Sequence, residues 1–235
     1  YNIALPTARV LIFFPMAIMG ILLPLTSELW VKKEKVLLKA GMDLLYKYSI
    51  IVILPLVFIM LSFTELLINV LYGKSYILAA NAMKILVIGM IFATLFAINS
   101  SFFSGIGKPK IITKIVYTAA IFNLISNIIL IPIIGIIGAA LTTTIGYFIM
   151  MLMGLIIIRK FIKITIPLKT WIKTFIAGLI FIFIIWFLKK VIFLNVLAET
   201  AIVLIISGIS YLALLFLLKV VNINELKDLY TRIVK

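Results

Sequence analysis

Seven stretches of the chain are apolar over about twenty residues each, and no other feature restricts its possible folds as strongly. They span residues 3–25, 48–71, 81–104, 115–134, 136–158, 171–188 and 200–218. A helix rises about 1.5 Å per residue and the hydrocarbon core of a bilayer is about 30 Å thick, so roughly 20 apolar residues cross it as one helix. The runs are unbroken rather than alternating, which favours helices over the strands of a membrane barrel. We predict an all-α integral membrane protein with seven transmembrane helices.

The residue composition excludes most soluble and enzymatic classes of protein. Hydrophobic residues make up 66% of the 235 residues and charged residues 12%, whereas soluble domains have about half and about a quarter. The chain contains no Cys and no His, so it can form neither a Cys/His metal site nor a Ser-His-Asp or Cys-His catalytic centre. We therefore expect a protein that is not an enzyme and that uses no metal and no cofactor.

Lysine and arginine residues collect on one side of the predicted topology. Of the 22, 17 lie in or beside the loops that follow the first, third and fifth stretches, or in the C-terminal tail. The opposite side has three, Lys74, Lys189 and Lys190. Because such residues accumulate in cytoplasmic loops, we expect a multi-pass protein of the cell membrane with its tail in the cytoplasm and Tyr1 outside. This asymmetry accounts for most of the net charge of +15, so no nucleic-acid partner is expected.

Two charged segments, residues 28–47 and 219–235, have one apolar face when drawn as helices. Leu37 and Leu44 lie on that face in the first segment, and Leu226 in the second. Helices of this kind lie along the headgroup region of a membrane. We expect a cytoplasmic linker at 28–47 and a cytoplasmic tail at 219–235, each against lipid headgroups. The alternative is a surface that docks a partner.

Two cations lie inside the predicted spans, where an ionisable group is costly and needs a reason. Arg9 is six residues into the first stretch, and Lys84 is three residues into the third. Arg9 either binds a phosphate or pyrophosphate in an internal cavity or extends its side chain to the outer headgroups. For Lys84 the same alternatives hold, and its position near a span end favours the headgroups. No carboxylate lies in mid-span, which argues against a carboxylate proton relay within this chain.

Asparagines and prolines mark two further features of the spans. Asn123 and Asn127 are four residues apart and share one helix face, where they either line a polar cavity or form hydrogen bonds between helices. Pro15 and Pro55 fall within the first and second stretches, where a missing N–H and a ring clash kink a helix. Such kinks are either passive or, beside a cavity, sites of movement.

Short motifs follow one another in a fixed order along the first five spans. The main ones are LYGKSY at 71–76, SGIGKPK at 104–110, the Asn123 to Asn127 segment and IPIIGIIGAA at 131–140. This ordered set resembles the C-terminal half of polysaccharide and lipid-linked oligosaccharide flippases, which belong to the MATE-like multidrug/oligosaccharidyl-lipid/polysaccharide exporter superfamily. The resemblance covers residues 3–161, and the last two spans match by position only.

The resemblance implies a domain organisation. Such flippases have two pseudo-symmetric lobes around a cavity that opens alternately to either side. Residues 1–161 would form most of the second lobe with five transmembrane helices, 162–218 two extra C-terminal helices, and 219–235 the tail. An N-terminal lobe would then be missing, and it would be a partner encoded in the same or a separate chain.

The resemblance also implies a function, namely moving an undecaprenyl- or dolichyl-type lipid-linked oligosaccharide between leaflets by alternating access. Its partners would be that substrate and the membrane lipids. By resemblance, Arg9 would hold the lipid pyrophosphate, and Asn123 and Asn127 match family asparagines in the cavity region.

Alternative functions stay open at the level of the sequence. A cation-coupled multidrug exporter of the same superfamily is the nearest, although exporters of that kind usually need buried carboxylates. A receptor-like protein with seven helices has the same topology, but the last span has no lysine for a retinal Schiff base.

Overall fold

The computed structural model describes residues 1–192 and 195–221, and within these ranges it consists of helices joined by short connections, without strands. The long helices are α2 (Phe13–Val31), α3 (Lys35–Ser62), α5 (Ala79–Gly105), α6 (Pro109–Ile134), α7 (Ile136–Ile158), α8 (Leu168–Val191) and α9 (Val196–Leu217). The short ones are α1 (Ala4–Arg9), α4 (Thr64–Tyr72) and the 3-10 turns η1 (Val10–Ile12) and η2 (Lys74–Tyr76). Seven helical segments of the described part are long and apolar enough to cross a membrane, α1 to α2 counting as one, so that prediction is confirmed.

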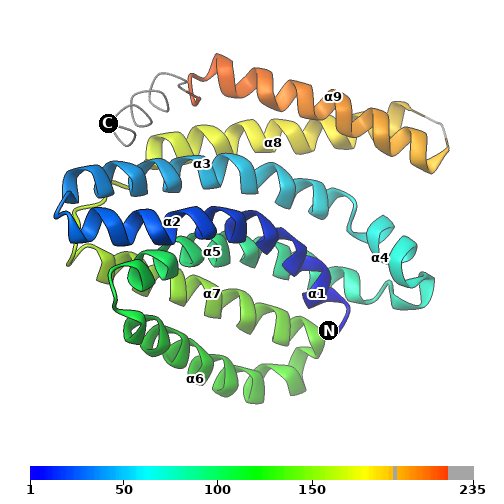
Figure 1. Cartoon of the computed structure of the whole chain (residues 1–235). Coiled ribbons are helices and arrows are strands. Elements are labelled where there is room, and N and C mark those ends of the chain that lie inside the picture. The colour runs from blue at the N-terminus through cyan, green and yellow to red at the C-terminus, as the bar shows by residue number, and fades with distance from the viewer. Residues whose placement is uncertain (193–194, 222–235) are drawn as a thin grey trace.

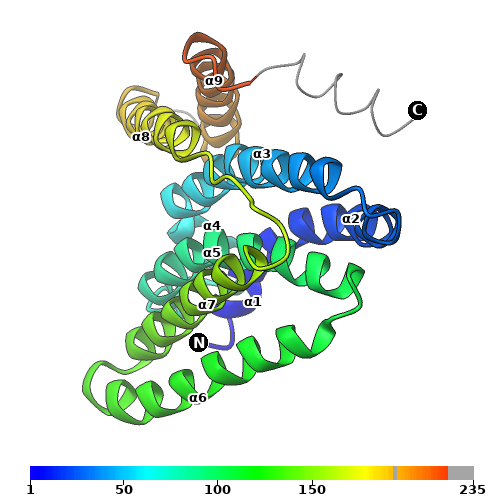
Figure 2. The same cartoon turned by 90° about the vertical axis from the view of Figure 1, so that its left-hand side faces the viewer.

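The helices are stacked in layers around α5 (Figures 1 and 2). The pair α8 and α9 forms one outer layer, α3 lies beneath it, and α6 lies at the opposite side beyond α7. Helix α5 packs against α1, α2, α3 and α7. In its most apolar stretch 61% of the residues are buried, compared with 6% in the corresponding stretch of α6. The core is therefore built on α5, and α6 is attached mainly through α7.

Glycine and proline explain where two of the long helices end and begin. After α5 the chain turns at Gly107, which has a φ of +72°, and α6 begins with Pro109, whose missing N–H costs nothing in the first turn. Gly135, with a φ of +60°, is the single residue between α6 and α7. The turn at Gly135 makes α6 and α7 an antiparallel hairpin.

The glycines of α7 allow close helix packing at two of three positions. A Cβ on Gly138 would lie 2.7 Å from the carbonyl oxygen of Leu130 in α6, and one on Gly154 would lie 2.6 Å from Nδ2 of Asn99 in α5. A Cβ on Gly146 would meet no atom within 4 Å. Small residues therefore hold α7 close to both neighbours, with open space between the two contacts.

The segment expected as a surface linker is not separate from the membrane helices. Residues 28–47 form the end of α2 and the first turns of α3, which runs from Lys35 to Ser62 rather than from 48 to 71. Leu37 and Leu44 of the apolar face are half-buried, whereas the neighbouring Leu38 and Met42 pack into the protein and are at most 2% exposed. The tail residues 222–235 lie outside the described residues.

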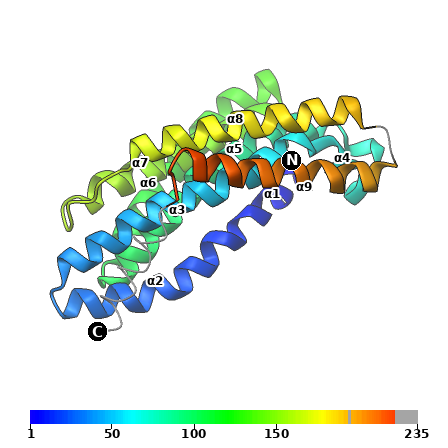
Figure 3. The same cartoon turned by 90° about the horizontal axis from the view of Figure 1, so that it is seen from above.

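Helices α8 and α9 lie within the range 162–218, and they dock on α3. Figure 3 shows them side by side over the other helices. The indole N–H of Trp171 donates to the carbonyl oxygen of Tyr46 at 3.1 Å, and the hydroxyl of Tyr211 donates to that of Ile51 at 2.9 Å. Each of the two helices thus has a side chain that is hydrogen-bonded to a backbone carbonyl oxygen of α3.

Asp43 ties the linker between α7 and α8 to α3. Its carboxylate accepts hydrogen bonds from the backbone N–H of Thr165 at 2.7 Å, from the Thr165 hydroxyl and from Nζ of Lys39 at 2.6 Å.

Replacing Asp43 with alanine should raise the rate of trypsin cleavage in the linker between α7 and α8 roughly fivefold, because hydrogen bonds that contribute about 1 kcal/mol to holding the linker on α3 are lost. Glu28→Ala, which removes an exposed pair with Lys32, is the control. Equal cleavage of both variants would contradict the tether.

Basic residues gather at one end of the bundle, here called the lysine-rich end. It comprises the α2–α3 turn, the α5–α6 turn, the 159–167 linker and residues 218–221 directly after α9, which lie toward the same side of the molecule in Figure 1. At the opposite end of the bundle, Lys74 lies in the η2 turn between α4 and α5, and Lys189 and Lys190 lie in the last turn of α8. The charge separation found in the sequence is thus also a separation in space.

Candidate functional site

A cavity of about 320 Å³ lies between the start of the chain, α1, α6 and α7. Its polar lining comes from Tyr1, Arg9, Asn123, Thr143 and Tyr147. The rest of the lining is small or apolar and includes Gly146, whose missing side chain leaves part of the space open. The structure therefore brings together Arg9 and Asn123, two residues that the sequence singles out, from helices more than 100 residues apart.

Arg9 is placed at this cavity by a change of helix type. It is the last residue of α1, and the 3-10 turn η1 follows it directly. Pro15 lies just beyond and cannot donate the backbone hydrogen bond that the carbonyl of Leu11 would accept in a continuous α-helix. Pro55, by contrast, lies inside α3 without interrupting it.

The guanidinium of Arg9 has no ion pair or hydrogen bond within residues 1–192 and 195–221, and the side chain is exposed at the cavity. A cation in a membrane helix is costly when nothing compensates it. A guanidinium stays charged at any physiological pH and offers planar pairs of donors that fit phosphate oxygens. Arg9 is thus available to an anionic ligand that enters the cavity.

Hydrogen bonds connect the polar residues of α6 and α7 to the cavity. The hydroxyls of Tyr1 and Thr143 share a hydrogen bond of 2.8 Å, and Nδ2 of Asn123 donates to Thr143 at 3.4 Å. Nδ2 of Asn127 donates to Oδ1 of Asn123 at 2.9 Å. The amide of Asn123 is thus held from both sides.

Asn127 receives its own support from α7, because the hydroxyl of Thr142 donates to Oδ1 of Asn127. Asn123 therefore has both of the roles considered for it, lining the cavity and bonding between helices. Asn127 does not line the cavity and holds Asn123 in place. Thr143 and Tyr147 escaped the sequence analysis, although their spacing of four residues puts them on one face of α7.

Lys84 is not at this cavity. Its Nζ forms an ion pair with Oε1 of Glu65 at 3.1 Å, which joins α5 to α4. The Lys84 and Glu65 side chains are 38% and 63% exposed. The structure thus separates Lys84 from Arg9, Asn123 and Asn127, and its partner explains why the cation is tolerated near the end of a span.

Seven apolar helices define the class as a polytopic membrane protein, and three of its helical segments, α1, α6 and α7, border an open cavity that Arg9 and Asn123 line. Residues 7–218 match the family model described as lipid II flippase MurJ, and the chain belongs to the MurJ family. The prediction of a multi-pass membrane protein related to flippases of lipid-linked glycans is thereby confirmed.

Two individual proteins are similar to the chain in sequence. Over its whole length the chain is 38% identical to an uncharacterized membrane protein of Methanocaldococcus jannaschii, of which it covers 46%. Over 63% of its length it is 22% identical to the probable low-salt glycan biosynthesis flippase Agl15 of Haloferax volcanii, and that match covers 31% of Agl15.

The fold is also similar to a solved structure of lipid II flippase MurJ in an inward closed conformation. The TM-score is 0.70 at 20% identity, and the match covers 90% of this chain and 45% of that structure. The chain thus spans less than half the length of each of these relatives.

Proposed function

We propose that the protein containing this chain moves a lipid-linked oligosaccharide across the cell membrane by alternating access, and that it acts as a transporter rather than as an enzyme. The observation that carries the proposal is the meeting of Arg9 and Asn123 at one cavity. Relatives described as flippases for lipid II and for glycan biosynthesis support it. On this proposal the lysine-rich end faces the cytoplasm, as the distribution of basic residues favours.

Two polar groups of the cavity hold the cargo. The guanidinium of Arg9 pairs with phosphate oxygens of the pyrophosphate that links lipid and sugar. The amide of Asn123, fixed by Asn127 and Thr143, is placed to hydrogen-bond the headgroup. A cavity of about 320 Å³ is too small for a whole glycan, so the remaining wall comes from a further lobe of the protein. We place this chain in the second lobe, and the change of helix type between Arg9 and Pro15 is the point where α1 can tilt.

Filling the cavity provides the test of this proposal. Gly146 lines the cavity, and a Cβ added there would meet no atom within 4 Å, so a leucine extends into the space without displacing a neighbour at its base. In the full-length protein reconstituted in vesicles, Gly146→Leu should reduce flipping of a pyrophosphate-linked oligosaccharide lipid at least tenfold. Flipping is measured as exposure of the glycan to an external lectin.

The matched control is Gly208→Leu in α9, where a Cβ also meets nothing within 4 Å but no part of this cavity is lined. That variant should flip the lipid at the wild-type rate. Equal flipping by both variants would show that the cargo does not pass this cavity.

A further inference from the structure

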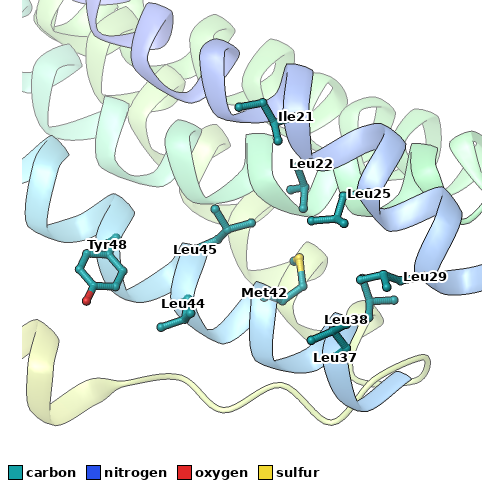
Figure 4. A pocket seen from close by; sticks show the side chains of 11 residues that line it. Ile21, Leu22, Leu25, Leu29, Leu37, Leu38, Met42, Leu44, Leu45 and Tyr48 are labelled. Atoms are coloured by element: carbon teal, nitrogen blue, oxygen red, sulfur yellow. The ribbon is translucent and has the colours of Figure 1, made fainter. Parts of the chain in front are cut away.

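A second hollow lies between α2 and α3 at the lysine-rich end (Figure 4). It has a volume of about 280 Å³ and is lined almost wholly by aliphatic side chains, among them Leu22, Leu25, Leu38 and Leu45. Tyr48 supplies the lining's one side-chain hydroxyl, and Figure 4 shows it turned away from α2. A sugar or peptide in this hollow would lose its hydrogen bonds to water without replacing them, whereas a hydrocarbon chain loses none.

Gly41 gives the hollow its depth. It lies in α3 among the lining residues, and no atom is found within 4 Å of the position where a Cβ would lie. The backbone there is ordinary α-helix, so a larger residue could be accommodated by the helix itself. The space is therefore free because a side chain is absent.

A neighbouring hollow with a mixed charged and apolar lining shares Leu37 with the apolar one. Its volume is about 360 Å³, and its charged lining consists of Lys33, Glu34 and Lys35. Lys35 lies over the ring of Trp30 at 5.3 Å. Two cationic side chains and one carboxylate thus line the hollow next to the apolar one.

Lys33 occupies a backbone position that normally favours glycine. Its φ is +60°, and α2 ends there with the N–H of Glu34 bonded to the carbonyl of Leu29. Helix α5 ends in the same pattern with Gly107 at the equivalent place. A side chain at such a position is disfavoured by crowding with the backbone, so the lysine is present at a cost to the local conformation.

From this juxtaposition we infer that the protein binds one anionic membrane phospholipid between α2 and α3, with part of an acyl chain against Gly41 and its leucines and the phosphate at Lys33 and Lys35. The apolar hollow matches the acyl chain of such a lipid and the lysines match its anionic headgroup. The lysines lie nearer the end of the bundle than the hollow does, as a headgroup lies nearer the membrane surface than its acyl chain. The site shares no residue with the Arg9 cavity, so it is separate from the proposed path of the cargo.

Native mass spectrometry of the delipidated full-length protein tests the inference, with phosphatidylglycerol and phosphatidylcholine of identical chains as probes. The wild type should retain one phosphatidylglycerol in preference to phosphatidylcholine. Gly41→Trp should lower that affinity at least tenfold, whereas Gly41→Ala, which adds one methyl group in open space, should keep it. Equal retention by the tryptophan variant and the wild type would overturn the site.

The headgroup part has its own variant, Lys33→Gly with Lys35→Gln. Each charge lost should weaken phosphatidylglycerol binding roughly fivefold and leave phosphatidylcholine unchanged. Thermal stability should not fall, because glycine suits the conformation at position 33. Unchanged selectivity would overturn the assignment of the phosphate.

A photoreactive residue in place of Leu25 identifies the occupant directly. A phospholipid adduct supports the inference. An adduct with another part of the protein, such as residues 222–235, or with a second copy of the chain shows that the groove is covered by protein and overturns it.

Discussion

Replacing Arg9 with alanine in the full-length protein should lower flipping of a pyrophosphate-linked oligosaccharide lipid about 10- to 100-fold, because a charge-assisted pair with a phosphate contributes about 1.5–3 kcal/mol. The effect falls on transport and not on membrane insertion, since removing a charge from an apolar helix makes insertion easier. The measurement is the rate at which the glycan becomes exposed in reconstituted vesicles, with the amount of inserted protein determined in parallel.

Two further variants separate charge, geometry and position. Arg9→Lys keeps the charge but loses the planar pair of donors, so it should restore part of the activity. Lys84→Ala removes a cation that is paired with Glu65 away from the cavity, and it should flip the lipid within about twofold of the wild type. Wild-type flipping by Arg9→Ala would show that the guanidinium does not hold the cargo.

Replacing Gly138 with valine should destabilise the α6–α7 hairpin more than any exposed substitution. A Cβ there would lie 2.7 Å from the carbonyl oxygen and 2.9 Å from the carbonyl carbon of Leu130, and backbone atoms cannot rotate away. Overpacking of this kind costs about 1–3 kcal/mol, or roughly 2–12 °C in melting temperature. Because α6 would move relative to α7, the hydrogen bond between Thr142 and Asn127 should be lost as well, and with it the position of Asn123.

The melting temperature of the purified protein in detergent measures this effect. Gly208→Val is the matched control, because it makes the same substitution in a helix where a Cβ meets nothing within 4 Å. Melting temperatures that are equal for the two variants would contradict the close contact between α6 and α7.

The number and type of the spanning helices could be predicted from the sequence, because hydropathy over about twenty residues depends only on neighbouring residues. The start of α3 could not, because its first turns are charged on one side and bury Leu38 and Met42 on the other. That pattern is the same for a helix on headgroups and for one packed against protein. Only the tertiary contacts distinguish the two.

The candidate site was predictable where a residue type is unusual in a membrane. Arg9 and Asn123 are conspicuous in an apolar span, whereas Thr143 and Tyr147 resemble ordinary residues of membrane helices. Lys84 is as conspicuous as Arg9, and its pairing with Glu65 arises from the packing of α4 on α5. The α2–α3 hollow depends on the space between two helices, for which the sequence alone has no signal.

The central place of α5 has a consequence for the order in which the protein assembles during synthesis. Helices α2 and α3 both leave the ribosome before α5, yet each packs against α5 more extensively than against the other. They must therefore remain in the lipid as loosely associated segments until α5 is inserted. We therefore expect the core to form when α5 is inserted, and α6, α7, α8 and α9 to join it afterwards, as their order in the chain requires.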